Sequence, residues 1–238
     1  MIAADDTAIA KGPGLVEHVI DYLRDHVANE RLRPGAKLPS ETTISLTLGV
    51  SRPVVREAMR TLAATGLVEM AVGKRATIVP VDGEMISRVI ENAVLIGQAD
   101  AADILEMRRG IEIATVTLAA ARRSDAQAAE LQAIVAEMAG LLHDAEAYAE
   151  RDLHLHATLA KATGNPLYPL LIEAFRQLIQ ASMREGLERW AATPKLARVQ
   201  ELHEQIVAAV ADRDPAAAAE AMARHFDDAI SAILGAKG

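Results

Sequence analysis

Helix-breaking residues punctuate the second two thirds of the chain, and this pattern constrains the fold more than any other feature. Between the breaks, apolar residues recur every three or four positions, which is the period of an amphipathic helix. Ala and Leu dominate these stretches, and aromatic residues make up only 3% of the chain, a composition typical of helical proteins. The predicted helices span residues 85–97, 102–122, 125–143, 145–163, 166–190, 194–212 and 215–234. We therefore expect an all-α bundle of six or seven helices.

Three shorter helices are predicted nearer the N-terminus. Residues 14–29 carry an apolar stripe at helical spacing. Ser40 is well placed to cap a second helix, which a tight turn at Gly49 ends. Ser51 caps a third helix that runs to about Thr65. Two helices separated by so short a turn are typical of a helix-turn-helix.

A short hairpin follows the third helix. Its predicted strands are Leu67–Ala71 and Ala76–Val79, joined by a turn at Val72–Arg75. The next segment, PVDGE, is the only plausible linker between domains. The predicted domains are residues 1–80 and residues 85–238, with residues 81–84 between them.

Charge is unevenly distributed along the chain, whose formal net charge is -8. Residues 81–238 carry fifteen Lys and Arg against twenty-four Asp and Glu, whereas residues 31–75 carry eight against three. A basic region on an acidic protein is the pattern of a module that contacts phosphate. An unevenly charged solvated surface explains these totals equally well, so the spacing of the basic residues has to decide.

The third helix, SRPVVREAMRTL at residues 51–62, has one basic and one apolar face. Arg52, Arg56 and Arg60 recur every fourth residue and form a row. The apolar arc beside that row consists of Val54, Val55, Ala58, Met59 and Leu62. Three arginines at this spacing, taken alone, more often mark a solvent-exposed helix face than a DNA-binding one. Here a capped helix, a turn, an arginine helix and a hairpin with Lys74 and Arg75 at its tip follow in the order of a winged helix-turn-helix. In that motif the second helix enters the major groove, where arginine binds guanine and phosphate.

In this region the chain resembles the GntR family of bacterial transcriptional regulators. The matching motifs are LPSE (38–41), LGVSR (48–52), VREAMRTL (55–62) and GLVE (66–69). The resemblance implies a mostly α protein with an N-terminal winged helix-turn-helix of three helices and a two-stranded wing. It also implies that the following side chains face DNA: Arg33, Ser40, Glu41, Ser51, Arg52, Arg56 and Arg60. Arg52 and Arg56 are expected at base edges, and the two serines at phosphates. Ala76 departs from the glycine that is common in the family's wing.

Four residues of the helical half are spaced so that they can share one site. Asp152 and His156 are four residues apart on one helix face, whereas His154 lies on the other side. His203 and His225 lie on consecutive helices, and antiparallel packing can bring both to one level. A carboxylate and three imidazoles suit Zn²⁺ or another divalent transition metal. Taken singly, each histidine is more often a polar residue at a helix edge or a hydrogen-bonded core residue.

Residues 100–234 resemble the FCD class of effector domain, found in FadR-type GntR regulators. The landmarks are ILEMRRGIE (104–112), DLHLHATLAKATGNP (152–166), ELHEQIVAAVADRDPAAAAEAM (201–222) and RHFDD (224–228). In metal-binding members of the class an Asp and three His hold the ion, and these fall on Asp152, His156, His203 and His225. The resemblance implies a divalent transition metal ion, with Zn expected on purification and Ni, Mn or Fe as alternatives. A carboxylate can take the coordination positions that the protein leaves open.

Two further residues are candidates for binding the effector. Arg108 matches an arginine that the class directs into its cavity, where it can clamp a carboxyl group or a hydroxy-acid. Its alternative is a surface salt bridge with Glu112, four residues further on. Asn165 is predicted either to line the same pocket or to cap a helix break.

The sequence thus predicts a ligand-responsive transcriptional regulator, with repression as the expected mode. A homodimer would bind a pseudo-palindromic operator in double-stranded DNA and sense a small organic acid at the metal site. The alternative is a metal-dependent enzyme acting on a small organic acid, but no catalytic motif accompanies the histidines. The chain has no cysteine, which excludes disulfides and thiolate ligands. It also lacks a signal peptide pattern and any long uncharged apolar stretch, so a cytoplasmic location without a membrane partner is expected.

Overall fold

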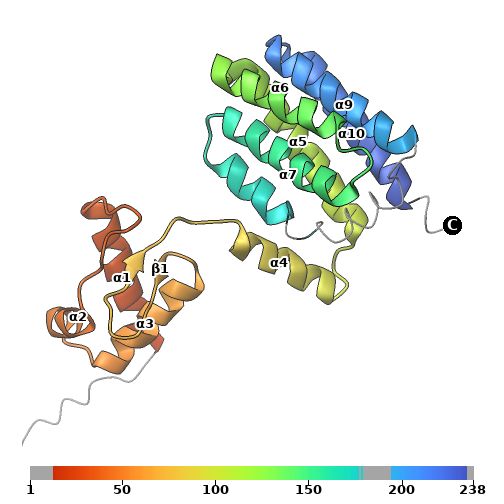
Figure 1. Cartoon of the computed structure of the whole chain (residues 1–238). Coiled ribbons are helices and arrows are strands. Elements are labelled where there is room, and N and C mark those ends of the chain that lie inside the picture. The colour runs from red at the N-terminus through yellow and green to blue at the C-terminus, as the bar shows by residue number, and fades with distance from the viewer. Residues whose placement is uncertain (1–12, 177, 179–193, 235–238) are drawn as a thin grey trace, which may run out of the picture. The chain divides into compact units, whose positions relative to one another are not determined.

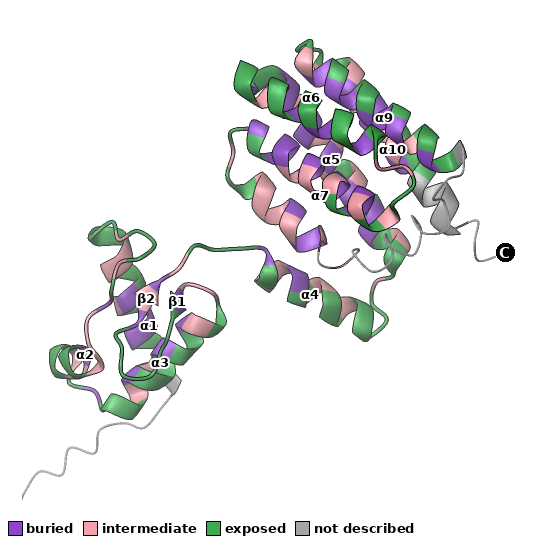
Figure 2. Cartoon of the chain, viewed as in Figure 1, coloured by how far each residue is buried: buried purple, intermediate pink, exposed green. Residues whose placement is uncertain are grey.

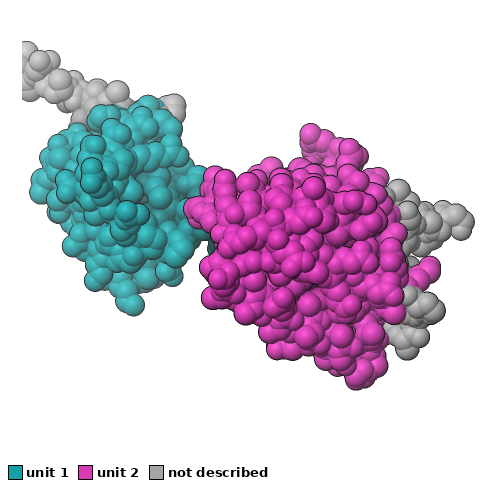
Figure 3. Space-filling model, turned by 90° about the horizontal axis from the view of Figure 1, so that it is seen from above, with its two compact units in different colours: residues 1–82 teal, residues 83–238 magenta. Residues whose placement is uncertain are grey.

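The computed structural model describes residues 13–176, 178 and 194–234. The chain divides into two compact units, residues 1–82 and residues 83–238, which Figure 3 shows in different colours. Residue 84, assigned to the linker from the sequence, is already the first residue of a helix. Most of the second half of the predicted helix 166–190 lies outside the described residues.

Three helices and a small antiparallel wing make up the first unit (Figure 1). These elements are α1 (Pro13–Asn29), α2 (Glu41–Leu48), α3 (Arg52–Ala64), β1 (Val68–Glu69) and β2 (Thr77–Ile78). The order and type of all five elements were predicted from the sequence and are confirmed.

The link between α2 and α3 follows from the residues at the helix ends. The side chain of Ser40 accepts a hydrogen bond from the backbone N–H of Thr43, which is the expected N-cap of α2. Gly49 ends α2 with a left-handed φ of 65°, a conformation that glycine adopts without steric cost, and its N–H bonds to the carbonyl of Ser45. Ser51 occupies the N-cap position of α3, but its side chain makes no capping hydrogen bond. The turn between the two helices is therefore closed from the α2 side, where the N–H of Val50 also donates to the carbonyl of Ser45 and the hydroxyl of Ser45 donates to the carbonyl of Val50.

The wing is shorter than predicted and has an additional neighbour. Val68 lies opposite Ile78 and Glu69 opposite Thr77, so each strand has two residues instead of four or five. Pairing stops because the turn begins early: the N–H of Lys74 donates to the carbonyl of Ala71 at 3.1 Å. The far side of β2 pairs with residues 36–38, where the N–H of Ile78 donates to Ala36 and the N–H of Leu38 to Ala76. The sequence indicated only a helix break in that segment.

The core of the first unit is formed where α1, α2 and α3 meet the wing. α3 contributes Val55, Ala58, Met59 and Leu62, which are four of the five residues in its predicted apolar arc. Val54, the fifth, is half-buried. Figure 2 shows the opposite faces of these helices as exposed. α3 is thus anchored on one side and open to solvent on the other.

The second unit is entirely helical in the described residues. Its helices are α4 (Glu84–Leu95), α5 (Ala101–Arg122), α6 (Asp125–Ala139), α7 (Ala145–Ala162), a helical segment at residues 167–176, α9 (Pro194–Ala211) and α10 (Pro215–Leu234). The predicted bundle of six or seven helices is confirmed. α6 ends four residues earlier than predicted, at Ala139, because the next residue, Gly140, is a poor helix former.

The bundle is built around α5. This helix packs against α7, α9 and α10, while α6 covers α7 and α9, as Figure 1 shows. Their buried faces share one apolar core that includes Leu131, Met138, Leu155 and Phe226. Within the described ranges, no helix combines the length and the apolar character that a membrane span requires. The packing brings the inner faces of α5, α7, α9 and α10 together.

Gly83 joins α4 to the rest of the second unit at a point where no side chain fits. A Cβ at this position would lie 2.5 Å from the backbone nitrogen of Ala174 and 2.7 Å from the carbonyl oxygen of Leu170. We expect Gly83→Ala to lower the free energy of unfolding by about 1–3 kcal/mol, since the backbone of residues 170–174 would have to move. Urea denaturation of the full chain, followed by circular dichroism, measures this.

Gly110→Ala is the matched control for that substitution. Gly110 lies within α5, and a Cβ there would meet no atom within 4 Å. Alanine should raise the free energy of unfolding by about 0.5–1 kcal/mol, because glycine is the poorer residue in a helix. If both variants shifted stability in the same direction, the close approach at Gly83 would have no energetic importance.

Candidate functional site

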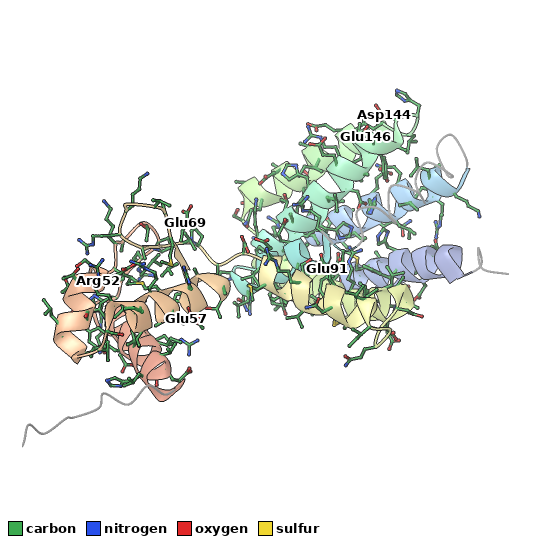
Figure 4. All side chains as sticks on the ribbon, turned by 90° about the horizontal axis from the view of Figure 1, so that it is seen from below. Arg52, Glu57, Glu69, Glu91, Asp144 and Glu146 are labelled. Carbon is green, nitrogen blue, oxygen red and sulfur yellow. The ribbon has the colours of Figure 1, made fainter. Side chains whose placement is uncertain are left out.

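The exposed face of α3 carries the predicted arginine row. The side chains of Arg52, Arg56 and Arg60 are 60%, 49% and 67% exposed, respectively. Arg60 lies at 3.7 Å from the carboxylate of Glu57 on the same helix. Arg52 and Glu57 are labelled on this helix in Figure 4. The helix thus presents three guanidinium groups to solvent on the side away from its core.

Glu41, at the start of α2, holds the central arginine of the row. Nε of Arg56 donates to Oε1 of Glu41 at 3.1 Å, and Nη2 donates to Oε2 at 2.7 Å. Nη2 of Arg52 lies 3.7 Å from the same carboxylate. The hydrogen bond from Arg56 lowers the pKa of Glu41 despite partial desolvation, so the carboxylate stays ionised. A bidentate pair of this kind fixes the plane of the guanidinium group.

Ser40, Ser51 and Arg33 all belong to the same unit. Ser40 is half-buried and its hydroxyl also bonds to that of Thr43 at 2.7 Å. Ser51 is exposed at the N-terminus of α3, where unsatisfied backbone N–H groups favour an anion. Arg33 is exposed and lies just before residues 36–38, the segment that pairs with β2. Of the two serines, Ser51 is better placed for a phosphate because its hydroxyl is not used for capping.

The wing does not present both of its basic residues in the same way. Lys74 is exposed within the turn, as predicted. Arg75 lies beyond the turn, and its Nε donates to the carbonyl oxygen of Leu38 at 2.7 Å while Nη2 reaches that of Lys37 at 3.4 Å. Its side chain therefore ties the wing to the neighbouring segment. In this conformation Lys74 is the basic group at the tip.

In the second unit, the packing brings together the four residues that the sequence singled out. Asp152 and His156 come from one face of α7, His203 from α9 and His225 from α10. The three imidazoles offer ligand atoms that all lie within 4.8 Å of one another. Oδ1 of Asp152 lies 3.0 Å from Nε2 of His203 and 3.9 Å from Nε2 of His156. Asp152, His156 and His203 are buried and His225 is half-buried.

The unpartnered atoms of this cluster test whether a metal ion fits. Nε2 of His203 and Nδ1 of His225 are both buried without a hydrogen-bond partner. Unpaired buried polar atoms are costly, and here they converge beside a carboxylate. A cation at their centre would satisfy them, and nitrogen with oxygen is a suitable ligand set for a divalent transition metal. The residues present therefore fit the ion that the sequence predicts.

Electrostatics in the cluster favour an ionised Asp152 and a neutral His225, whereas the pKa of His156 is raised because burial, which opposes this, is outweighed by Glu112 and Asp152. Burial opposes ionisation of Asp152, but the neighbouring His203 and His156 outweigh it and lower the pKa of Asp152. Burial, reinforced by His203 and His156, lowers the pKa of His225 well below its ordinary value. Both shifts favour the protonation states that bind metal.

A charged triad supports His156 from behind. Nδ1 of His156 hydrogen bonds to Oε2 of Glu112, so that Nε2 faces the cluster. The other oxygen of Glu112 accepts from Nε and Nη2 of Arg108, at 3.0 and 2.6 Å. Burial alone would raise the pKa of Glu112, but Arg108 and His156 outweigh it and lower the pKa to about 2. A carboxylate behind a ligating histidine fixes its ring orientation and raises its basicity.

Comparisons with known proteins agree with the two units. Residues 15–78 match the family of bacterial regulatory proteins named gntR, and residues 103–228 match the FCD domain. The chain is 33% identical over 211 residues to the HTH-type transcriptional regulator LutR of Bacillus subtilis (strain 168), covering 88% of this chain and 96% of LutR. The chain belongs to the GntR family. An Escherichia coli (strain K12) regulatory protein named for the L-lactate dehydrogenase operon is 27% identical, over 89% of this chain and 83% of its own length. The solved structure of a Streptococcus agalactiae GntR protein has a TM-score of 0.69 at 27% identity and covers 90% of this chain and 98% of its own.

This membership shows the chain to be a DNA-binding transcriptional regulator and not an enzyme, since both domains and all these relatives are regulatory. The structure also places the two effector candidates, Arg108 and Asn165. Arg108 does pair with Glu112, but both residues are buried, so the alternative of a surface salt bridge is wrong. The side chain of Asn165 accepts a hydrogen bond from the N–H of Leu167, which is the predicted capping role.

Two residues of this GntR-family site were missed in the sequence. The hydroxyl of Tyr148 on α7 lies 3.1 Å from Nδ1 of His203 and 3.1 Å from Oε1 of Gln200 on α9. Burial, then Asp152 and Glu204, raise the pKa of Tyr148, so the phenol keeps its proton. Helical spacing offered a signal, since Tyr148 precedes Asp152 by four residues and Gln200 precedes His203 by three.

Proposed function

We propose that this GntR-family regulator acts as a homodimer that binds a pseudo-palindromic operator and is released from it by a small carboxylic acid. The acid is sensed at a divalent metal ion held by Asp152, His156, His203 and His225. When bound, the ion supplies a Lewis acid at which a carboxylate can coordinate.

One observation carries the sensing half of this proposal. Nε2 of His203 lies 3.0 Å from Oδ1 of Asp152 without forming a hydrogen bond, and Nδ1 of His225 is buried without a partner. A site with no ligand to bind would be expected to pair such groups within the protein. The arrangement supports a bound cation more simply than it supports a hydrogen-bonded core.

A carboxylic acid is the favoured effector class for two reasons. The Escherichia coli relative is named for an operon of L-lactate dehydrogenase, whose substrate by that name is a hydroxy-acid. In the present chain, the buried Arg108 is joined to the ligand His156 through one carboxylate, that of Glu112. An incoming carboxylate near the ion would compete with Glu112 for this guanidinium group. We propose that this competition transmits effector binding to α5, the helix that carries Arg108 and Glu112.

The DNA-binding half uses the arginine row of α3. Two such helices related by a two-fold axis would match the symmetry of a pseudo-palindrome. Arg52 and Arg56 are proposed at base edges, with Ser51 and Arg33 at phosphates. An effector that alters the relative placement of the dimer's two winged helix-turn-helix units changes DNA affinity by the coupling free energy, typically about 1–3 kcal/mol.

A thermal-shift screen of monocarboxylates, dicarboxylates and sugar acids tests the sensing proposal. A true effector at about 100 times its dissociation constant stabilises the folded chain by about 2.7 kcal/mol. For a domain of this size we expect the unfolding midpoint to rise by roughly 5–10 °C. Each acid is measured with and without a strong chelator, and the rise should be lost in the chelator. Matched amides, which lack the carboxylate, are the control compounds.

Two results would contradict the sensing proposal. The first is a rise in midpoint that survives complete removal of the metal, which would place the acid elsewhere. The second is a hit that raises the midpoint but leaves operator affinity unchanged in the same buffer. Recovering the acid unaltered after long incubation separates a regulator from an enzyme, because an effector is not consumed.

A further inference from the structure

A chain of hydrogen bonds leads from the backbone of α6 to His203. Tyr148, Gln200 and His203 are all buried, and Tyr148 and His203 are fully enclosed. Nε2 of Gln200 donates to the carbonyl oxygen of Val135 at 2.9 Å and to Oε1 of Glu204 at 2.9 Å. Oε1 of Gln200 meets the hydroxyl of Tyr148, which in turn meets Nδ1 of His203. These contacts connect three helices to one ring nitrogen.

The direction of each hydrogen bond follows from the chemistry of the groups. The carbonyl of Val135 can only accept, so the amide nitrogen of Gln200 must face it, and this settles which end of the carboxamide is oxygen. That oxygen can only accept, and Tyr148 therefore gives its one proton to Gln200. The hydroxyl oxygen is then left as an acceptor, and Nδ1 of His203 must carry the proton that it receives.

This assignment determines which atom of His203 is available to a metal. With the proton on Nδ1, the neutral ring has a lone pair on Nε2, and this atom lies 3.0 Å from Oδ1 of Asp152. Two acceptors would then face each other, which agrees with Nε2 having no hydrogen-bond partner. Neither acceptor can satisfy the other, but a cation can satisfy both.

We propose that Tyr148 and Gln200 are positioning residues that hold His203 in the Nδ1–H tautomer and so direct Nε2 to the metal. The inference rests on the proposed metal site and adds the residues that control its affinity. The support of His203 is electrically neutral, unlike that of His156, which bonds to the carboxylate of Glu112. The two ligands thus differ in basicity although both coordinate through Nε2.

Zn²⁺ affinity of the full chain, measured by competition with a chromogenic chelator, tests the proposal. Tyr148→Phe keeps the ring and removes only the hydroxyl, and it should weaken Zn²⁺ binding by about 10- to 100-fold. Gln200→Met should weaken it less, because Tyr148 can still accept from His203. The double variant should bind Zn²⁺ no more weakly than Tyr148→Phe alone, since the two residues act in series. Tyr168→Phe removes a hydroxyl from a half-buried tyrosine of the same unit and is the matched control.

A second measurement reads the tautomer directly. In the Zn²⁺-loaded wild type, long-range ¹H–¹⁵N correlation should show His203 protonated at Nδ1 and metal-bound at Nε2. Coordination through Nδ1 would overturn the proposal. Both measurements are made far below the unfolding midpoint, so that a loss of global stability alone leaves them unchanged. If Tyr148→Phe does not fold, the same two measurements on Gln200→Met still test the proposal.

The outcomes separate this inference from the proposed metal site. If the wild type bound no stoichiometric Zn²⁺, the metal site itself would be wrong. If the wild type bound Zn²⁺ and Tyr148→Phe bound it equally tightly, the metal site would stand and the positioning role would be refuted.

Discussion

The double variant Arg52→Ala/Arg56→Ala is expected to bind its operator about 30- to 10⁴-fold more weakly than the wild type. Each well-formed bidentate contact between an arginine and a base contributes about 1–3 kcal/mol, and about 1.4 kcal/mol corresponds to a factor of ten. Fluorescence anisotropy at a fixed salt concentration measures the affinity. The operator is first defined by selecting sequences from a random pool with the wild-type protein.

The fold should survive both substitutions. About half or more of each of the two side chains is exposed, and the apolar face of α3 that anchors the helix is untouched. Loss of Arg56 does leave Glu41 without its bidentate partner, but Glu41 lies at the surface where water can solvate it. The free energy of unfolding is therefore expected to change by no more than about 0.5 kcal/mol.

Arg24→Ala is the control for loss of a positive charge outside the predicted DNA-facing set. Arg24 is exposed on α1 in the same unit and lies outside the predicted DNA-facing set. It removes one positive charge and should change affinity for the operator and for random DNA alike, and only slightly. The double variant should instead lose most of its preference for the operator over random DNA. A folded double variant with unchanged operator affinity would show that α3 is not the reading helix.

Glu41 illustrates how far the sequence could lead at the DNA surface. The row of arginines on α3 was predictable because helical periodicity is local. The family resemblance also placed Glu41 among residues facing DNA. That its carboxylate fixes the plane of Arg56 depends on the angle between α2 and α3, which a periodic pattern does not contain. The sequence likewise predicted Arg75 at the tip of the wing. Its hydrogen-bond partners lie 37 and 38 residues away in the chain, and a local pattern does not reveal such contacts.

The metal cluster shows the same division. Asp152 and His156 could be paired from their spacing on one helix, and His203 with His225 from the reversal between two helices. The partners that support them were harder to find. Glu112 contacts His156 from 44 residues away, and Tyr148 contacts His203 from 55 residues away. Each of these side chains alone is unremarkable on an amphipathic helix, and only the packing of α5, α7 and α9 makes them part of one site.

His203→Ala is expected to reduce the metal content of the purified chain from about one ion per chain to none. It removes a ligand whose Nε2 lies next to Asp152 and whose other nitrogen is held by Tyr148. Inductively coupled plasma mass spectrometry of protein purified without chelator measures the content. In the wild type, adding a chelator should lower the unfolding midpoint, because an ion that binds the folded state stabilises it by mass action. In His203→Ala the chelator should have no effect.

The difference between metal-loaded and chelated forms of each variant is the quantity to compare. The missing imidazole leaves a cavity that destabilises the metal-loaded and the chelated form equally, so this loss cancels in the difference. His154→Ala provides the control, since His154 is a half-buried histidine of α7 that lies on the opposite side of this helix from Asp152 and His156. It should keep both the ion and the chelator response. A wild type without stoichiometric metal, or a His203→Ala variant with unchanged content, would contradict the site, because four convergent ligands cannot lose their most buried imidazole without losing affinity.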